Sequence, residues 1–129
     1  MCNVQPKPQE PSPPYDLAER TKQFALRVIR LYRSLPTGGE AGVIGRQLLR
    51  SSTSVGANYR AARRARSPSE FRAKMGIVEE EVDETLYWME LLVEADIVKR
   101  EKLGPLMKEA DELAAIAVAS IRTSKAGGR

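Results

Sequence analysis

Apolar residues recur three and four positions apart along four separate stretches of this chain, and this repeat limits the fold more than any other feature. An α-helix turns by about 100° per residue, so positions at these spacings share one face of a helix. The four stretches are residues 16–35, 40–66, 67–95 and 100–122. Each of them therefore predicts a helix with one apolar face and one polar face.

The repeat also predicts which side chains face the core. They are Leu17, Thr21, Phe24, Val28, Leu31 and Leu35 in the first stretch; Ile44, Leu48, Ser52, Val55, Tyr59 and Ala62 in the second; Phe71, Met75, Val78, Val82, Leu86, Met89 and Val93 in the third; and Leu103, Leu106, Ala110, Leu113, Ala117 and Ile121 in the fourth. The second stretch also contains four consecutive hydroxyl residues, 51–54, and Gly56, all of which have low helix propensity. We therefore expect packing, rather than local propensity, to hold the second helix.

Prolines separate these stretches or fall where a helix tolerates them. Pro36 opens a turn after the first stretch, and Pro105 falls in a first helical turn, where its missing N–H has no intrahelical partner. The sharpest local signal is at the start of the third stretch. There Ser67 can cap the helix, Pro68 fits its first position, and Glu70 can reach back to complete a capping box.

No stretch alternates polar and apolar residues over a useful length, so we predict no sheet. Four amphipathic helices joined by short connections favour an all-α, antiparallel up-down-up-down four-helix bundle, because short loops force antiparallel neighbours. The bundle is expected to span residues 16–122. Residues 1–15 contain five of the eight prolines and are expected to form a disordered arm, and 123–129 a flexible tail.

Composition excludes most enzyme classes. The chain has no histidine, the commonest general base and metal ligand, and its single cysteine is Cys2. Four-helix bundles that hold two irons use Glu-x-x-His motifs, so Glu81 and Glu84 alone make a poor metal site. We therefore expect no enzymatic activity, no cofactor and no metal. No apolar run approaches the ~20 residues that span a bilayer, so no membrane association and a cytoplasmic location are expected.

Two rows of side chains remain after the core positions are assigned. One row, on the third helix, comprises Ile77, Glu81, Glu84, Trp88, Leu91 and Ala95; the other, on the second helix, comprises Arg46, Arg50, Thr53, Ala57, Arg60 and Arg64. Trp88 and Leu91 on a second row indicate a contact between subunits, although a wide core face could also accommodate Trp88. The arginines of one row can pair with the carboxylates of the other. We expect Arg50 or Arg60 to do so and Arg64 to face solvent.

Three motifs together resemble a known family. They are LRSSTSVGAN at 49–58, SPSEF at 67–71 and EVDETLYW at 81–88. This combination resembles the four-helix bundle proteins called 23S rRNA intervening-sequence proteins, or the S23 family, over about residues 15–121. The resemblance implies a homopentamer and a distant similarity to the accessory protein of diversity-generating retroelements, a basic pentameric barrel that binds nucleic acid and a reverse transcriptase. The chain departs from the family by reading YRAARR at 59–64, which makes the second helix more basic.

Two functions fit these observations. The first is an RNA-associated oligomer, in which basic side chains repeated around a ring form a continuous positive surface. Its candidate RNA-binding residues are Arg60, Arg63, Arg64 and Arg66, together with Arg27 and Arg30 on the first helix. The candidate subunit interface comprises Ile77, Glu81, Glu84, Trp88, Leu91 and Arg50. The second function is a protein-only adaptor, in which arginines satisfy the acidic third helix and the bundle binds a partner protein such as a reverse transcriptase.

Overall fold

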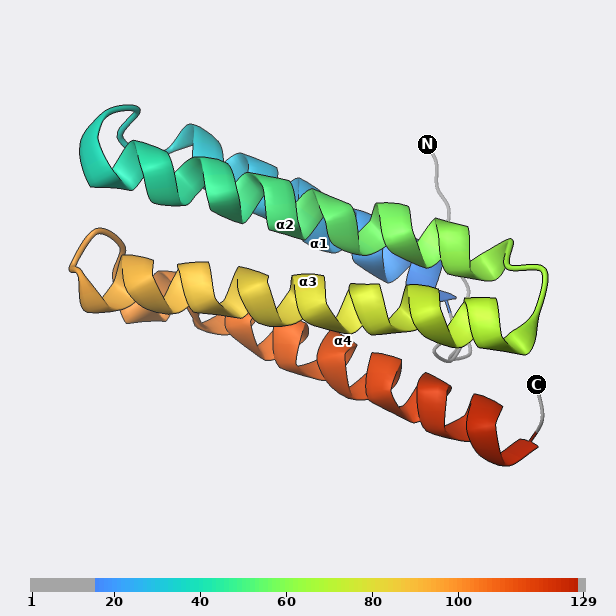
Figure 1. Cartoon of the computed structure of the whole chain (residues 1–129). Coiled ribbons are helices and arrows are strands. Elements are labelled where there is room, and N and C mark those ends of the chain that lie inside the picture. The colour runs from blue at the N-terminus through green and yellow to red at the C-terminus, as the bar shows by residue number, and fades with distance from the viewer. Residues whose placement is uncertain (1–15, 128–129) are drawn as a thin grey trace, which may run out of the picture.

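The computed structural model describes residues 16–127, which form four helices and contain no strand. These are α1 (Leu17–Arg33), α2 (Gly39–Arg63), α3 (Pro68–Glu94) and α4 (Arg100–Gly127). Successive helices run in opposite directions and are joined by short connections (Figure 1). The predicted all-α four-helix bundle is therefore confirmed. The expected arm at residues 1–15 lies outside the described residues.

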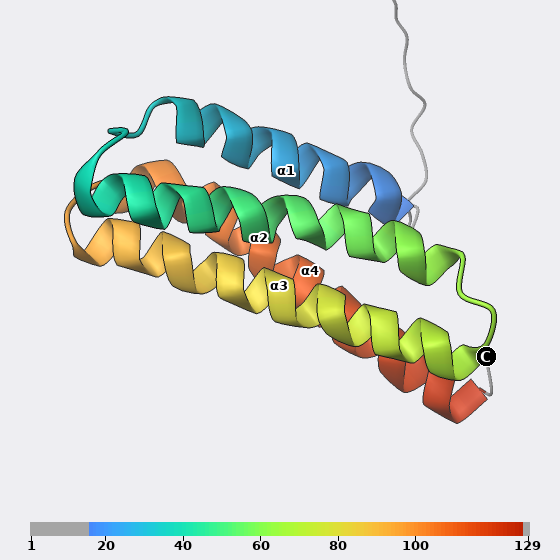
Figure 2. The same ribbon diagram turned by 45° about the horizontal axis from the view of Figure 1, so that its top comes forward.

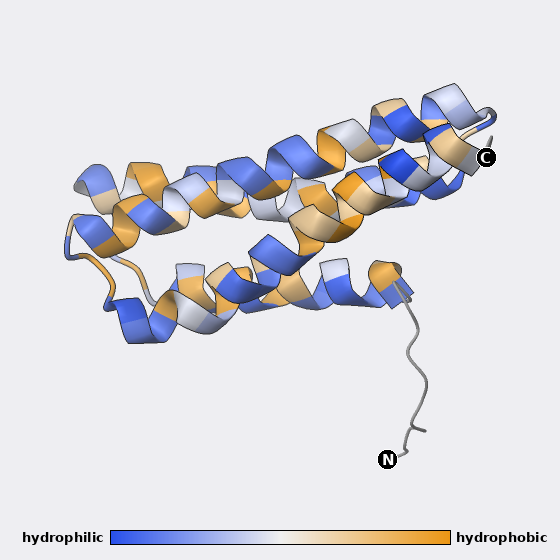
Figure 3. Cartoon of the chain, turned by 90° about the horizontal axis from the view of Figure 1, so that it is seen from below, coloured by the Kyte–Doolittle hydropathy of each residue, from blue (hydrophilic) through white to orange (hydrophobic). Residues whose placement is uncertain are grey.

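The core follows the predicted repeat closely. Every expected core position is buried or half-buried, and the half-buried ones are Ile44, Tyr59, Phe71, Leu86 and Ile121. Hydrophilic and hydrophobic residues are interspersed along each helix, as expected for amphipathic helices (Figure 3). A three-to-four spacing thus located the core without knowledge of the partners of each helix.

Small residues on α2 let its neighbours approach closely. A Cβ atom added at Gly56 would lie 3.2 Å from the hydroxyl oxygen of Thr21 on α1, which is tighter than ordinary van der Waals contact. On the α3 side, the buried hydroxyls of Ser51 and Thr85 are 2.8 Å apart and hydrogen-bonded. Ser52 is also buried, and its hydroxyl donates to the carbonyl oxygen of Leu49. The contacts of Gly56 with α1 and of Ser51 with α3 provide the close packing that we expect to hold this segment of low helix propensity.

Two helix ends differ from the sequence-based boundaries by three residues or more. Helix α2 ends at Arg63 rather than residue 66, because the backbone N–H groups of Arg64 and Ala65 turn to the carbonyls three residues back. Helix α4 continues to Gly127, so residues 123–127, which were expected to belong to a flexible tail, are helical. Ser124 explains this extension, since it is buried and receives a hydrogen bond from α3. Residues 128–129 lie outside the described part of the chain.

Helix α1 is shorter than the other three helices and contacts α4 far less than it contacts α2. As a result, the end of α2, the start of α3 and the end of α4 project together beyond the start of α1. Figure 2 shows the end of α4 beside the start of α3 and the connection between α2 and α3. This projecting end carries the arginines in the last turn of α2, Arg60 and Arg63.

Candidate nucleic-acid interface

A helix cap orders the connection between α2 and α3. The hydroxyl oxygen of Ser67 accepts a hydrogen bond from the Glu70 backbone N–H at 3.0 Å, and Pro68 occupies the first helical position. The Glu70 carboxylate accepts from the backbone N–H of Arg66 at 3.0 Å, one residue before the expected donor. The predicted cap is therefore confirmed, with its reciprocal half shifted by one residue. The cap fixes the backbone of the connection that contains Arg64 and Arg66.

The candidate arginines at the end of α2 are all exposed. These are Arg60, Arg63, Arg64 and Arg66. The guanidinium carbon of Arg63 lies 6.0 Å from the centre of the Tyr59 ring, within reach of a cation–π contact. Burial raises the pKa of the Tyr59 hydroxyl, so Tyr59 remains neutral at physiological pH. The arginine charges therefore face solvent, and no nearby phenolate neutralises them.

The fold adds three cations that the sequence did not place here. A hydrogen bond of 3.1 Å from Arg72 Nη1 to Ser124 Oγ joins the start of α3 to the end of α4. This contact brings Arg122 and Lys125, both exposed, to the same end of the bundle. We call this set the basic end: Arg60, Arg63, Arg64, Arg66, Arg72, Arg122 and Lys125. Of the nearby carboxylates, Glu70 serves in the helix cap and Asp16 acts electrostatically on Tyr59.

Two of the predicted RNA-binding residues lie elsewhere. The close approach of Gly56 to Thr21 sets the register of the antiparallel pair α1 and α2. In that register Arg27 lies level with α2 residues about ten positions before Arg60, or about 15 Å along the axis. Arg30 lies one further turn away. The structure therefore does not place Arg27 and Arg30 within the basic end.

Another basic residue of α1 is engaged inside the protein. Arg20 forms a two-point contact with Glu109 on α4, with Nε to Oε2 at 3.0 Å and Nη2 to Oε1 at 2.7 Å. Its Nη2 also lies 2.9 Å from Glu112. The hydrogen bond to Glu109, above all, raises the pKa of Arg20. Sequence reasoning missed this cluster because its members are 89 residues apart or more.

The two carboxylates of the candidate subunit interface on α3 already have partners within the same chain. Arg50 Nη1 lies 3.3 Å from Glu81 Oε1, and Arg50 also bonds Glu84. The indole Nε1 of Trp88 donates to Glu84 at 3.0 Å. These two bonds, with Arg50 the stronger influence, lower the pKa of Glu84. The prediction that Arg50 or Arg60 pairs with this row is thus confirmed for Arg50.

The apolar members of the row are half-buried. Ile77, Trp88 and Leu91 each retain some exposed surface, and Trp88 also packs against the core. The Tyr87 ring meets Trp88 edge-on, with ring centres 5.0 Å apart. Packing against the core of the same chain therefore buries part of the Trp88 side chain. That the exposed remainder contacts another subunit stays a prediction.

The described residues show neither a metal site nor a membrane span. Within residues 16–127, no three histidine, cysteine, aspartate or glutamate side chains gather closely enough to hold a metal ion. None of the helices in this range is both long enough and apolar enough to cross a bilayer.

These features define an antiparallel four-helix bundle with a concentration of positive charge at one end. The chain belongs to the family described as 23S rRNA-intervening sequence protein, whose model matches residues 15–119. A crystal structure from Bacteroides thetaiotaomicron VPI-5482, described as a protein with unknown function from the S23 ribosomal protein family, is similar with a TM-score of 0.78 and 34% identity. That match covers 83% of this chain and 99% of the other. No functionally curated protein matches. The resemblance noted in the sequence is confirmed.

Proposed function

We propose that this protein is a non-enzymatic, homo-oligomeric RNA-binding protein whose basic end contacts RNA phosphates. The observation that carries the proposal is the convergence of seven cationic side chains, from three helices and one connection, at one end of the bundle. Among residues 16–127, none of the seven forms an ion pair with a carboxylate. Such side chains gain affinity by neutralising phosphates and releasing their counterions.

The basic end favours contacts to the RNA backbone over contacts to bases. Proteins that bind single strands stack bases on accessible aromatic rings. In the described part of the chain, the large apolar side chains with high exposure are Leu26, Val43 and Tyr87, none of which belongs to the basic end. The Tyr59 ring is half-buried and lies against Arg63. A folded or double-stranded RNA, recognised by shape and phosphates, is therefore the preferred ligand.

Self-association would multiply this surface. We propose a closed ring of five copies, as the family resemblance implies, with Ile77, Trp88 and Leu91 completing their burial between subunits. Binding several phosphate groups through linked copies raises the effective concentration of each further contact. A weakly basic protomer can thereby become a strong RNA binder.

Fluorescence anisotropy with a labelled RNA hairpin at several salt concentrations tests the proposal. For Arg63→Gln/Arg64→Gln we expect affinity to fall about tenfold or more, and the slope of log K against log salt to decrease by about 1.4–1.8 units, since each phosphate contact contributes about 0.7–0.9. Arg46→Gln is the matched control, because Arg46 is an exposed arginine near the other end of α2. Absent binding, salt-insensitive binding or an equal loss in the control would contradict the proposal.

A specific observation supports the alternative, a protein-binding adaptor. The outer face of α3 exposes Glu80, Asp83 and Glu90 around Tyr87, whose exposed fraction is 51%. An acidic face with an accessible aromatic ring suits a basic protein segment and repels RNA. An adaptor predicts binding to an arginine-rich probe peptide that Asp83→Asn/Glu90→Gln weakens, with no affinity for the RNA hairpin. Hairpin binding that survives this double substitution favours the RNA function.

A further inference from the structure

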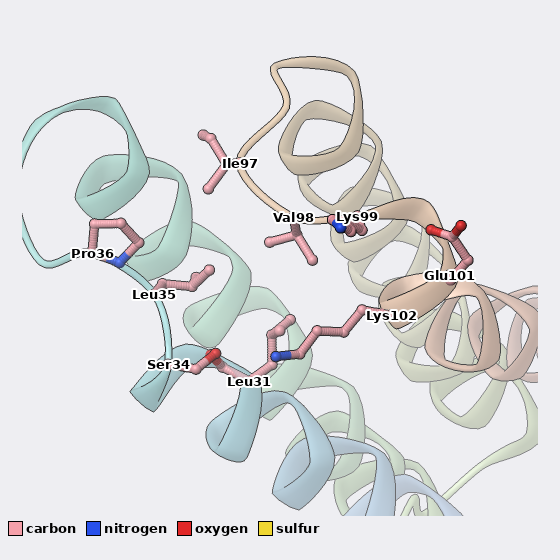
Figure 4. A pocket seen from close by; sticks show the side chains of 9 residues that line it. All are labelled: Leu31, Ser34, Leu35, Pro36, Ile97, Val98, Lys99, Glu101 and Lys102. Atoms are coloured by element: carbon pink, nitrogen blue, oxygen red, sulfur yellow. The ribbon is translucent and has the colours of Figure 1, made fainter.

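The end of the bundle opposite the basic end contains an open pocket with a volume of about 470 Å³. It lies where the connection between α1 and α2 faces the connection between α3 and α4 (Figure 4). This volume falls within the range of ~300–1,000 Å³ that is typical of small-molecule sites. The pocket is remote from the basic end, so it has no part in the proposed contacts with RNA.

Backbone hydrogen bonds hold the pocket in shape. Its apolar walls consist of Leu31, Leu35, Pro36, Ile97 and Val98. Asp96 reverses the chain with a positive φ of 61°, after which the N–H groups of Ile97 and Val98 both donate to the carbonyl oxygen of Leu92. On the opposite wall, the Ser34 hydroxyl donates to the Leu31 carbonyl oxygen at 2.7 Å. The walls are therefore formed before any ligand arrives.

The rim of the pocket is basic on its inner side. Lys99, just before α4, and Glu101 and Lys102, in its first turn, line the pocket. Figure 4 shows Lys102 extending from α4 across the pocket toward Leu31, whereas the Glu101 carboxylate lies on the side away from Leu31. Neither lysine is in an ion pair with any residue between 16 and 127. The Lys102 ammonium group thus stands beside an apolar hollow without an ion pair to any carboxylate of residues 16–127.

We propose that this pocket binds an aliphatic carboxylate, with the hydrocarbon chain against Ile97 and Val98 and the carboxylate at Lys102. A neutral apolar molecule would cover the Lys102 ammonium group without supplying a counter-charge, which carries a desolvation cost. A polyanion such as RNA would pair with the lysines but would make no contact with the apolar walls of the pocket. A molecule with one apolar chain and one negative group satisfies both halves of the pocket.

Titration of the full chain with hexanoate, heptanoate and octanoate, followed by methyl NMR, tests the apolar half. We expect shifts confined to the methyl groups of Leu31, Leu35, Ile97 and Val98. The dissociation constant should fall about three- to fourfold with each methylene that enters the pocket. Shifts centred elsewhere, an affinity independent of chain length, or no shifts below the micelle concentration would each overturn the proposal.

Charge reversal tests the polar half. Lys102→Glu should weaken octanoate binding at least tenfold while leaving 1-octanol binding unchanged, because the alcohol carries no charge. Lys108→Glu is the matched control, since Lys108 is an exposed lysine on the same helix outside the pocket. Equal loss in both variants, octanol binding as tight as octanoate in the parent protein, or unchanged octanoate binding by Lys102→Glu would show that no carboxylate site exists here.

Discussion

Replacing Arg20 with glutamine tests the contact that joins α1 directly to α4. Glutamine has nearly the same helix propensity as arginine, so the change acts on the ion pair rather than on α1 itself. The Arg20 side chain is 35% exposed, while that of Glu109 is only 18% exposed. The substitution would therefore leave a largely buried carboxylate without its two-point partner.

The expected loss of unfolding free energy lies between two known limits. Exposed ion pairs contribute about 0–1 kcal/mol, and breaking a fully buried pair costs about 3–5 kcal/mol. Solvent screening at the partly exposed Arg20 moves the value toward the lower limit, so we expect Arg20→Gln to cost about 2 kcal/mol. For a domain of this size, that loss corresponds to a melting temperature lower by about 8 °C.

Urea unfolding followed by circular dichroism measures this cost. The matched control is Lys22→Gln, because Lys22 pairs with Glu19 on the same helix at 3.8 Å and both side chains are more than half exposed. The control should change stability by less than about 0.5 kcal/mol. A double-mutant cycle with Glu109→Gln should give a coupling energy of about 1–2 kcal/mol. If Arg20→Gln is as stable as the control, or the coupling is near zero, the reasoning fails.

Three further substitutions test other parts of the structure. Trp88→Ala should lower the oligomer mass measured by light scattering and leave helicity largely intact, whereas an unchanged mass with cooperative loss of helicity would assign Trp88 to the core alone. Ser67→Ala should cost about 1 kcal/mol in thermal unfolding through loss of the α3 cap, and no change would show that the cap is dispensable. Because the pKa of Glu84 is lowered in the folded state, its bond to Arg50 should stabilise the fold above the usual carboxyl pKa of 4.5, with that stability lost as pH falls through the lowered value. Arg50→Gln should therefore flatten the pH dependence of the melting temperature below about pH 4.5, and an unaltered acid profile would contradict this assignment.

The sequence alone was sufficient for the helices and the core because both depend on local spacing. Phe24 and Val28, for example, share a helix face whatever packs against them. The pair between Arg50 and Glu84 was also within reach, since α2 and α3 are consecutive and their charged rows have the same period. Short connections force consecutive helices to lie side by side.

The remaining contacts depend on register between distant helices, which spacing does not encode. Nothing in the sequence near Arg20 indicates that Glu109 will be its partner. Arg72 and Lys125 were missed for the same reason, because the register of α3 against α4 decides that they join the arginines at the end of α2. The glycines near the C-terminus suggested a tail there, so the sequence did not predict the helical segment that contains Lys125.

The sparse contact between α1 and α4 has a consequence for how the protein folds. Helices α2, α3 and α4 each pack on a neighbour that is close in the chain, so these hairpins close short loops. The contact of Arg20 with Glu109 instead closes a loop of 89 residues, at a greater cost in chain entropy. During synthesis, α1 leaves the ribosome before the other three helices, whereas its partner Glu109 lies on α4, the last of the four. The first helix of the bundle is thus one whose packing is completed only after the last helix of the bundle has been translated.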